Sequence, residues 1–191
     1  MREQEKEFNF NMNKKYRLEL IKAMSFLGKQ KKTIFIGQAV SYPGTAMTGT
    51  LEQVSIKKRI ELPVAEEMQL GISLGLSFKG YTPISIFPRW NFLLLAANQL
   101  VNHVDKINEM GAKKFRNKII IRTSVGSQRP LHPQSQHVGN FTNAFKSICP
   151  DIDFIVLNEP RDIFKAYKKA YERTDNKSTV LVEFGDYYGE K

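Results

Sequence analysis

Apolar positions along the chain alternate between a helical spacing and short continuous runs. Helical spacing that ends at a glycine or begins at a proline marks helix boundaries, as at Gly28 and Pro160. The continuous runs have the length and composition of strands that are buried on both faces. These patterns predict helices over residues 14–28, 64–79, 91–110, 140–148 and from Pro160, and strands over 33–37, 82–87, 117–124, 153–157 and 178–184. We therefore predict an α/β fold with a mostly parallel sheet and helices on both of its faces.

Three predicted loops, at residues 37–50, 87–91 and 124–139, each follow a strand directly. In open parallel sheets, ligands bind beyond the carboxyl ends of the strands. Long loops within compact domains are also frequently functional. The sequence therefore predicts that a binding site lies among these three loops.

The length and composition fit one globular domain: the chain has 191 residues, 41% hydrophobic and 25% charged. We expect a single domain over residues 14–191, preceded by a flexible extension at residues 1–13. The longest apolar run, FLLLAA at 92–97, is shorter than the roughly 20 residues that cross a membrane. The N-terminal sequence has no secretory signal, and the single cysteine, Cys149, is consistent with a reducing compartment. We expect a soluble, cytoplasmic protein with Cys149 as a small buried residue.

The net charge of +10 raises the question of nucleic-acid binding. However, the basic residues form short groups that are scattered along the chain, and no nucleic-acid-binding motif is present. A solvated surface or an acidic partner explains these groups more simply. Nucleic-acid binding is therefore the weakest of three functional hypotheses, and we expect no nucleic acid among the partners.

Two adjacent glutamates, Glu66 and Glu67, follow Pro63 at the predicted start of a helix. The helix dipole stabilises an anion in the first turn, so this position alone explains either residue. Neighbours on a helix point about 100° apart, so only one of the two can face the protein while the other meets solvent. Further along, Gly71 and Gly75 leave space for a second backbone, which predicts a close helix–helix contact within the chain or between chains.

Two further clusters carry candidate chemistry. Aromatic residues gather at the junction after the strand over 82–87, where Phe87 and Phe92 could pack in the core or form a wall for a flat ring. The loop at 124–139 contains His132 and His137, which are either surface residues or acid–base groups. The chain contains neither a glycine-rich phosphate-binding motif nor a serine-hydrolase elbow, and no histidine pattern typical of zinc ligands.

The order of these motifs resembles the pyrimidine-binding domain of thiamine-diphosphate-dependent enzymes, which are transketolase-like. The most specific segments are 63–66, 91–92 and 99–102, which match the patterns P-[IVL]-[AS]-E, N-F and Q-[VIL]-[VIL]-N without a gap between them. The similarity covers nearly all of the chain from about residue 14, and it is strongest to the beta subunit of 2-oxo acid dehydrogenases.

The resemblance implies roles for individual residues. The family's glutamate at the position of Glu66 hydrogen-bonds a ring nitrogen of the aminopyrimidine and favours its imino tautomer, which then removes the thiazolium proton. The resemblance implies no such role for Glu67. It also implies that Phe92, with Phe87 and Pro88 nearby, lines the aminopyrimidine pocket. His137, or alternatively His132, resembles the histidine that contacts the substrate.

The resemblance also implies a partner. This sequence lacks the G-D-G…N motif that binds diphosphate and magnesium, so a separate diphosphate-binding, alpha-type subunit would hold magnesium, and we assign no metal ligand in this chain. A homodimer within a heterotetramer is the expected assembly. The reaction would cleave or form a carbon–carbon bond of a small 2-oxo acid or ketose-like substrate. The chain has Gln38 where the family usually has an acid, and we expect it to be without the C-terminal domain of dehydrogenase beta subunits. The alternative is therefore a non-catalytic scaffold protein with the same fold.

Overall fold

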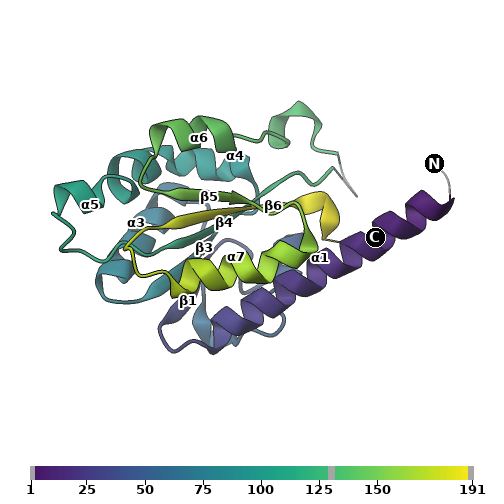
Figure 1. Cartoon of the computed structure of the whole chain (residues 1–191), viewed down its shortest axis with the longest axis horizontal. Helices are drawn as coiled ribbons and strands as arrows, with labels where there is room; N and C mark the ends of the chain where they lie inside the picture. Colours follow the sequence, from purple (N-terminus) through teal and green to yellow (C-terminus); the bar gives the residue numbers. More distant parts are fainter. Residues whose placement is uncertain (1–2, 129–131, 189–191) are drawn as a thin grey trace.

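The computed structural model describes residues 3–128 and 132–188, with side chains from residue 12 onward. Within that part of the chain, six strands form one sheet in the order β2-β1-β3-β4-β6-β5, and every neighbouring pair is parallel (Figure 1). The strands are β1 Thr33–Gly37, β2 Arg59–Glu61, β3 Thr82–Ile86, β4 Ile120–Val125, β5 Asp153–Val156 and β6 Thr179–Phe184. The predicted α/β class is confirmed, and the sheet is parallel throughout.

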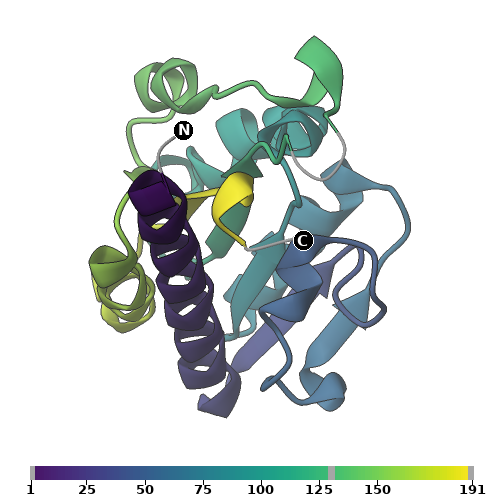
Figure 2. The same ribbon diagram turned by 90° about the vertical axis from the view of Figure 1, so that its right-hand side faces the viewer.

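Helices cover both faces of this sheet. Their bounds are α1 Glu3–Lys29, α2 Ala46–Gly49, α3 Glu66–Phe78, α4 Trp90–Leu93, α5 Ile107–Met110, α6 Thr142–Ile148 and α7 Pro160–Glu172. On one face α1 and α7 lie side by side and bury Leu20, Met24 and Tyr167 against the sheet (Figure 2). On the other face α3, α4 and α6 enclose a second core around Trp90 and Phe145. Both cores come from apolar strand runs whose side chains alternate between the two faces.

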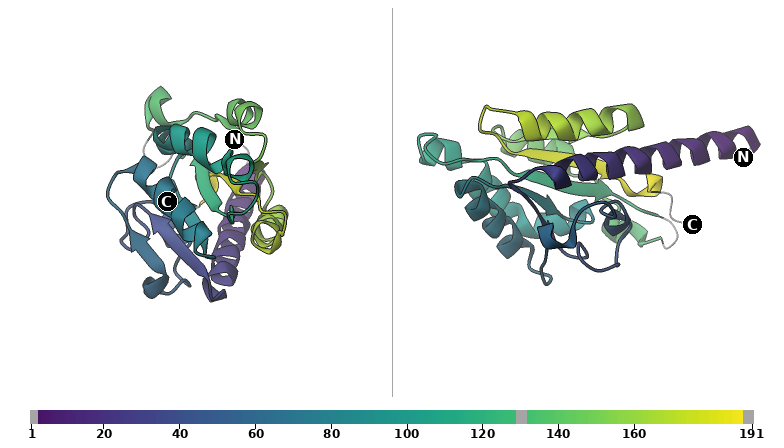
Figure 3. Two further views of the ribbon diagram at one scale, coloured as in Figure 1. Left: turned by 90° about the vertical axis from the view of Figure 1, so that its left-hand side faces the viewer. Right: turned by 90° about the horizontal axis from the view of Figure 1, so that it is seen from below.

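Several boundaries differ from the prediction. Helix α1 begins at Glu3, not at residue 14, and its N-terminal part extends past the sheet (Figure 3). Helix α3 begins at Glu66 with Ala65 as its N-cap, so Pro63 lies outside the helix and does not occupy its first turn. Both glutamates nevertheless lie in the first turn of α3, as predicted from the position of Pro63.

The predicted helix over 91–110 is divided into segments. After α4 come a 3-10 turn over Leu94–Ala96, a π-helix over Gln99–Val104 and then α5. Apolar spacing does not distinguish these forms, because all of them return a side chain to the same face after three to five residues. The predicted loop at 124–139 contains a 3-10 turn over Gln134–His137, and its residues 129–131 lie outside the described part of the chain.

Two other sequence expectations are addressed by the structure. Cys149 is fully buried in the second core, as predicted, and burial raises the pKa of its thiol to about 11. Among the described residues, no helix is both long enough and apolar enough to cross a membrane.

Candidate functional site

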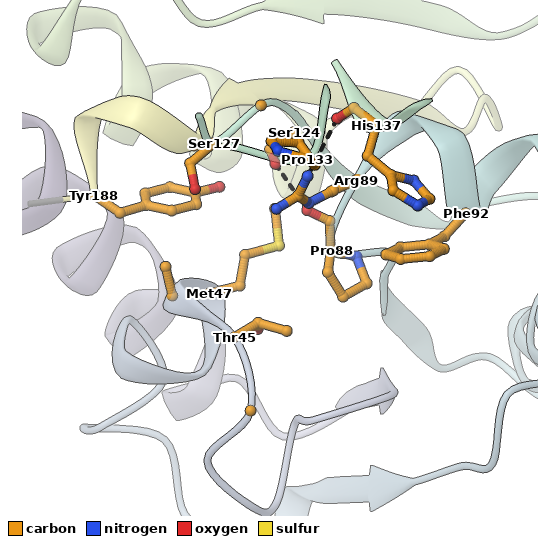
Figure 4. A pocket seen from close by; sticks show the side chains of 14 residues that line it. Thr45, Met47, Pro88, Arg89, Phe92, Ser124, Ser127, Pro133, His137 and Tyr188 are labelled. Carbon is orange, nitrogen blue, oxygen red and sulfur yellow. Dashed lines mark hydrogen bonds between the residues drawn. The ribbon is translucent and has the colours of Figure 1, made fainter. Parts of the chain in front are cut away.

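A cleft of about 430 Å³ opens at the carboxyl ends of the strands, where the sequence predicted a site. Its walls are the loop after β1, the β3–α4 junction, the loop after β4 and the turn after β6 (Figure 4). Three of the predicted site residues line this cleft. Pro88 and Phe92 come from the β3–α4 junction, and His137 comes from the turn over Gln134–His137. The three predicted loops therefore meet at one site.

His137 is the histidine that faces this cleft. Its ring lies 5.4 Å from the Phe92 ring between centroids, at an interplanar angle of 39° (Figure 4). Its Nδ1 atom is buried and has no hydrogen-bond partner among the described residues. His132, by contrast, is exposed, and its Nδ1 accepts a hydrogen bond from the Gln134 backbone at 3.0 Å. The geometry therefore favours His137 of the two sequence candidates.

The turn that carries His137 is fixed by two side chains of the β3–α4 junction. Arg89 donates from Nη1 to the His137 carbonyl at 3.3 Å, and Asn91 donates from Nδ2 to the Gln136 carbonyl at 2.9 Å. Both bonds join segments more than 40 residues apart in sequence. Asn91, part of the N-F motif, therefore positions the histidine turn next to Phe92.

Phe87 does not line the cleft. Its side chain is 1% exposed and lies in the second core with Leu70 and Trp90. Its backbone N–H donates to the Arg122 carbonyl at 2.8 Å, which continues the β3–β4 ladder by one residue. Phe92 therefore faces the cleft, while Phe87 supports the wall from within the core, which is one of the two alternatives that the sequence left open; its place near the cofactor stays a prediction.

Glu66 and Glu67 are separated as helical geometry predicted. Glu66 is 4% exposed, whereas Glu67 is exposed to solvent. The Glu66 carboxylate accepts a hydrogen bond from Nε2 of Gln38 at 3.1 Å, so the residue that departs from the family pattern contacts the glutamate directly. Glu66 forms no ion pair with any described residue. The two glutamates therefore have different environments although they are adjacent in sequence.

Glu66 borders a second hollow rather than the main cleft. This hollow, of about 440 Å³, is lined by residues 65–68 and Leu95. Leu95 lies three residues after Phe92 in consecutive helical turns, and residues at that spacing share one helix face. Leu95, which lines this hollow, and Phe92, which lines the cleft, therefore lie on the same side of this helical segment.

The loop after β1 is held by two charged residues of β2 that sequence reasoning missed. Glu61 accepts hydrogen bonds from the backbone N–H groups of Ala39, Val40 and Ser41, at 2.5, 2.9 and 2.7 Å. Arg59 donates from Nη1 to the Val40 carbonyl at 3.1 Å and also reaches carbonyls further along the loop. Residues two apart on a strand point to the same side. The spacing of Arg59 and Glu61 was therefore the sequence feature that could have indicated a strand with two charges facing one loop.

Beneath the cleft lies a buried ion pair between Arg122 of β4 and Glu183 of β6. Arg122 donates to the carboxylate through Nε at 2.5 Å and Nη2 at 2.9 Å. Tyr167 and Tyr188 also donate to Glu183, and Tyr188 in turn lines the cleft. Burial alone would lower the pKa of Arg122, but the adjacent Glu183 carboxylate raises it above its ordinary value. The floor of the site is thus tied to a charged, fully buried network.

The fold agrees with comparisons to known proteins. The family described as "Transketolase, pyrimidine binding domain" matches residues 13–186. The chain belongs to this family.

The relatives extend this result. The chain is 29% identical over 164 residues to the pyruvate dehydrogenase E1 component subunit beta of Rickettsia conorii, a match that covers 84% of this chain and 49% of the relative. It is 30% identical over 135 residues to the chloroplastic subunit beta-3 of Oryza sativa subsp. japonica, covering 71% of this chain and 33% of the relative. The predicted resemblance to dehydrogenase beta subunits is confirmed, and the chain spans half or less of these relatives.

Solved structures share the fold. One is described as "Split gene transketolase, inactive beta4 tetramer", with a TM-score of 0.68 at 16% identity, covering 89% of this chain and 51% of that chain. Another is the transketolase of Campylobacter jejuni, with a TM-score of 0.64 at 15% identity, covering 87% of this chain and 25% of that chain. At these identities, the comparison shows the fold alone.

Proposed function

We propose that this chain is the pyrimidine-binding subunit of a split thiamine-diphosphate-dependent enzyme. The enzyme would form or cleave a carbon–carbon bond next to the carbonyl of a 2-oxo acid or a ketose-like substrate. A partner subunit with the G-D-G…N motif would hold the diphosphate and magnesium. When bound, thiamine diphosphate supplies the reactive carbon and the electron sink that amino-acid side chains lack.

The observation that carries this proposal is the environment of Glu66. A carboxylate this deeply buried is normally paired with a cation or with several donors. Glu66 has one amide donor, Gln38, and no cation among the described residues. A carboxylate so placed can accept a hydrogen bond from a protonated ring nitrogen of an aminopyrimidine. The residues present therefore fit the cofactor that the family implies.

The other site residues have complementary roles in this proposal. Pro88 and Phe92 present apolar surface to the cleft, which suits a flat aromatic ring. His137 lies beside Phe92 with a buried nitrogen that has no partner among the described residues, so it can hold or move a proton at the substrate. Gln38 orients the Glu66 carboxylate, which offers an account of its departure from the family's acid at that position.

The exposed face of α3 supports the need for a partner. A Cβ atom added at Gly71 or Gly75 would meet no described atom within 4 Å apart from the neighbouring residues and backbone of α3 itself, so the predicted close packing does not occur within the described part of the chain. Met68 and Ile72, on the same helix, are 44% and 38% exposed. We therefore assign the close helix contact to an interface with another subunit. The description of the similar split-gene beta4 tetramer as inactive agrees with a requirement for a different second subunit.

Reconstitution tests the proposal against the scaffold alternative. The full chain is mixed with a candidate subunit that carries the G-D-G…N motif, and thiamine diphosphate binding is measured by calorimetry with and without magnesium. Turnover is then measured with pyruvate and with a ketose. The proposal predicts cofactor binding and turnover only in the mixture. Assembly of the two subunits without cofactor binding would instead support the scaffold function.

A further inference from the structure

Among the described residues, the main cleft is lined by one strong cation and by no carboxylate. Of the described residues that line it, none is aspartate or glutamate, while Arg89 contributes a guanidinium group. A cationic side chain in a cleft usually pairs with a carboxylate of the protein or with a ligand. Arg89 forms no ion pair with any described residue, and one of its N–H groups is used by the His137 carbonyl.

The Arg89 guanidinium therefore retains donors for a ligand. An arginine side chain has five N–H donors in a planar fork that matches an oxyanion with two oxygens. Only the Nη1 contact at 3.3 Å joins Arg89 to the rest of the described chain through its side chain. The side chain is half-buried, which strengthens an electrostatic contact relative to one in open water.

The position of Arg89 is fixed by its neighbours in the chain. Before it, the Pro88 carbonyl accepts a hydrogen bond from Ser124 Oγ at 2.7 Å, which joins the ends of β3 and β4. After it, Trp90 is fully buried and donates from Nε1 to Thr142 at 3.2 Å. The backbone on both sides of Arg89 is therefore anchored, which places the start of its side chain at the cleft.

Carboxylates near the cleft are engaged elsewhere. Glu183 is bound by Arg122 and two tyrosines in the buried network. Asp186 accepts a hydrogen bond from the Gln128 backbone at 2.7 Å. Neither forms an ion pair with Arg89, so the guanidinium beside the His137 turn has no counter-ion among the described residues.

We propose that Arg89 binds the anionic group of the substrate and so determines that the enzyme acts on an anion. This inference rests on the proposed function, because it assigns the substrate to the same cleft. The ligand group is a carboxylate of a 2-oxo acid or a phosphate of a phosphorylated ketose, since both offer paired oxyanions to the guanidinium. Arg89 beside His137 would hold the substrate with its carbonyl toward the histidine and the Phe92 wall.

The experiment uses the isotope-labelled full chain, without cofactor or partner, and follows cleft resonances by NMR. The chain is titrated separately with pyruvate, with inorganic phosphate, and with acetone as a ketone of no charge. The expected result is saturable shifts of the His137 and Gly126 signals with at least one anion and none with acetone. Tighter binding of pyruvate indicates a 2-oxo acid, and tighter binding of phosphate indicates a phosphorylated substrate.

Variants then test Arg89 itself. Arg89→Gln should weaken anion binding roughly ten- to a hundredfold, the loss expected for a charge-assisted donor pair, and Arg89→Lys should weaken it less. Arg161→Gln, which removes an exposed arginine outside the cleft, should have no effect. Asn91→Ala removes the other hydrogen bond to the histidine turn but keeps the Arg89 charge, so it should weaken binding less than Arg89→Gln.

Three results would overturn the assignment: unchanged anion affinity in Arg89→Gln, equal effects of Asn91→Ala and Arg89→Gln, or no response of the wild-type cleft to either anion. The titration needs neither thiamine diphosphate nor a partner subunit. A chain that binds anions through Arg89 but never turns over in a mixture would contradict the proposed function and leave the anion site standing.

Discussion

The buried pair of Arg122 and Glu183 makes a sharp stability prediction. Both side chains are 0% exposed, and the carboxylate accepts two bonds from Arg122 as well as those from Tyr167 and Tyr188. Glu183→Gln keeps the shape but leaves the arginine charge buried without its counter-ion. Breaking one partner of a buried pair costs about 3–5 kcal/mol. For a chain of this size, that corresponds to a melting temperature lower by roughly 6–20 °C.

Urea and thermal unfolding measure this loss, and two variants serve as controls. Glu172→Gln breaks an exposed pair with Lys168, so we expect a change within about 0.5 kcal/mol. The double variant Arg122→Met with Glu183→Gln removes both charges, keeps an acceptor oxygen for Tyr167 and Tyr188, and should recover most of the stability lost in Glu183→Gln alone. A loss below about 1 kcal/mol in Glu183→Gln, or no recovery in the double variant, would refute the reasoning.

Three further predictions follow from the same structure. Burial and then the Glu183 charge raise the pKa values of three tyrosines, Tyr16, Tyr167 and Tyr188, above the ordinary value of 10.0. As the pH rises, the folded state therefore keeps these protons after the unfolded state has released them. The contribution of the three tyrosines to the free energy of unfolding is full below pH 10 and falls above it. Urea titrations at pH 8 and pH 11 will measure this difference. Glu61→Ala removes the acceptor of three backbone bonds and should cost about 1.5–3 kcal/mol, with amide exchange accelerated at Ala39, Val40 and Ser41; unchanged exchange would contradict the loop clamp. The double variant Gly71→Ala with Gly75→Ala should stabilise the isolated chain by about 1–2 kcal/mol, because alanine favours the helix. It should weaken subunit association, measured by sedimentation. Tighter association would exclude this face of α3 as the interface.

The fold was predictable where length, composition and flanking residues favour the same element. The run TIFIG predicted β1 with its observed bounds, because it is short, rich in β-branched and aromatic residues, and bounded by lysines and a loop. Strand β2 was missed because it has three residues at the sheet edge, and two of them are charged residues that bind a loop instead of packing in a core. Such a strand is defined by its neighbour, which a local pattern does not contain.

Part of the candidate site was also predictable from the sequence. Motif spacing singled out Glu66, and helical geometry required that Glu66 and Glu67 differ in exposure. The sequence left open whether Phe87 packs in the core or lies near the cofactor, because the direction of a side chain at the end of β3 depends on how that strand pairs with β4. The position of Arg89 beside His137 depends on contacts between segments distant in sequence, so only the structure brings them together.

The central claim is that Glu66, and not its neighbour, serves the cofactor. The direct measurement is hydrogen–deuterium exchange at the thiazolium C–H of thiamine diphosphate in the assembled enzyme, for wild type, Glu66→Gln and Glu67→Gln. Glu66→Gln can still accept the hydrogen bond from Gln38, but it removes the negative charge that would stabilise a protonated ring nitrogen of the aminopyrimidine. We predict that exchange is abolished in Glu66→Gln, with the fold and assembly intact, and that Glu67→Gln exchanges at the wild-type rate. Full exchange in Glu66→Gln would contradict the account.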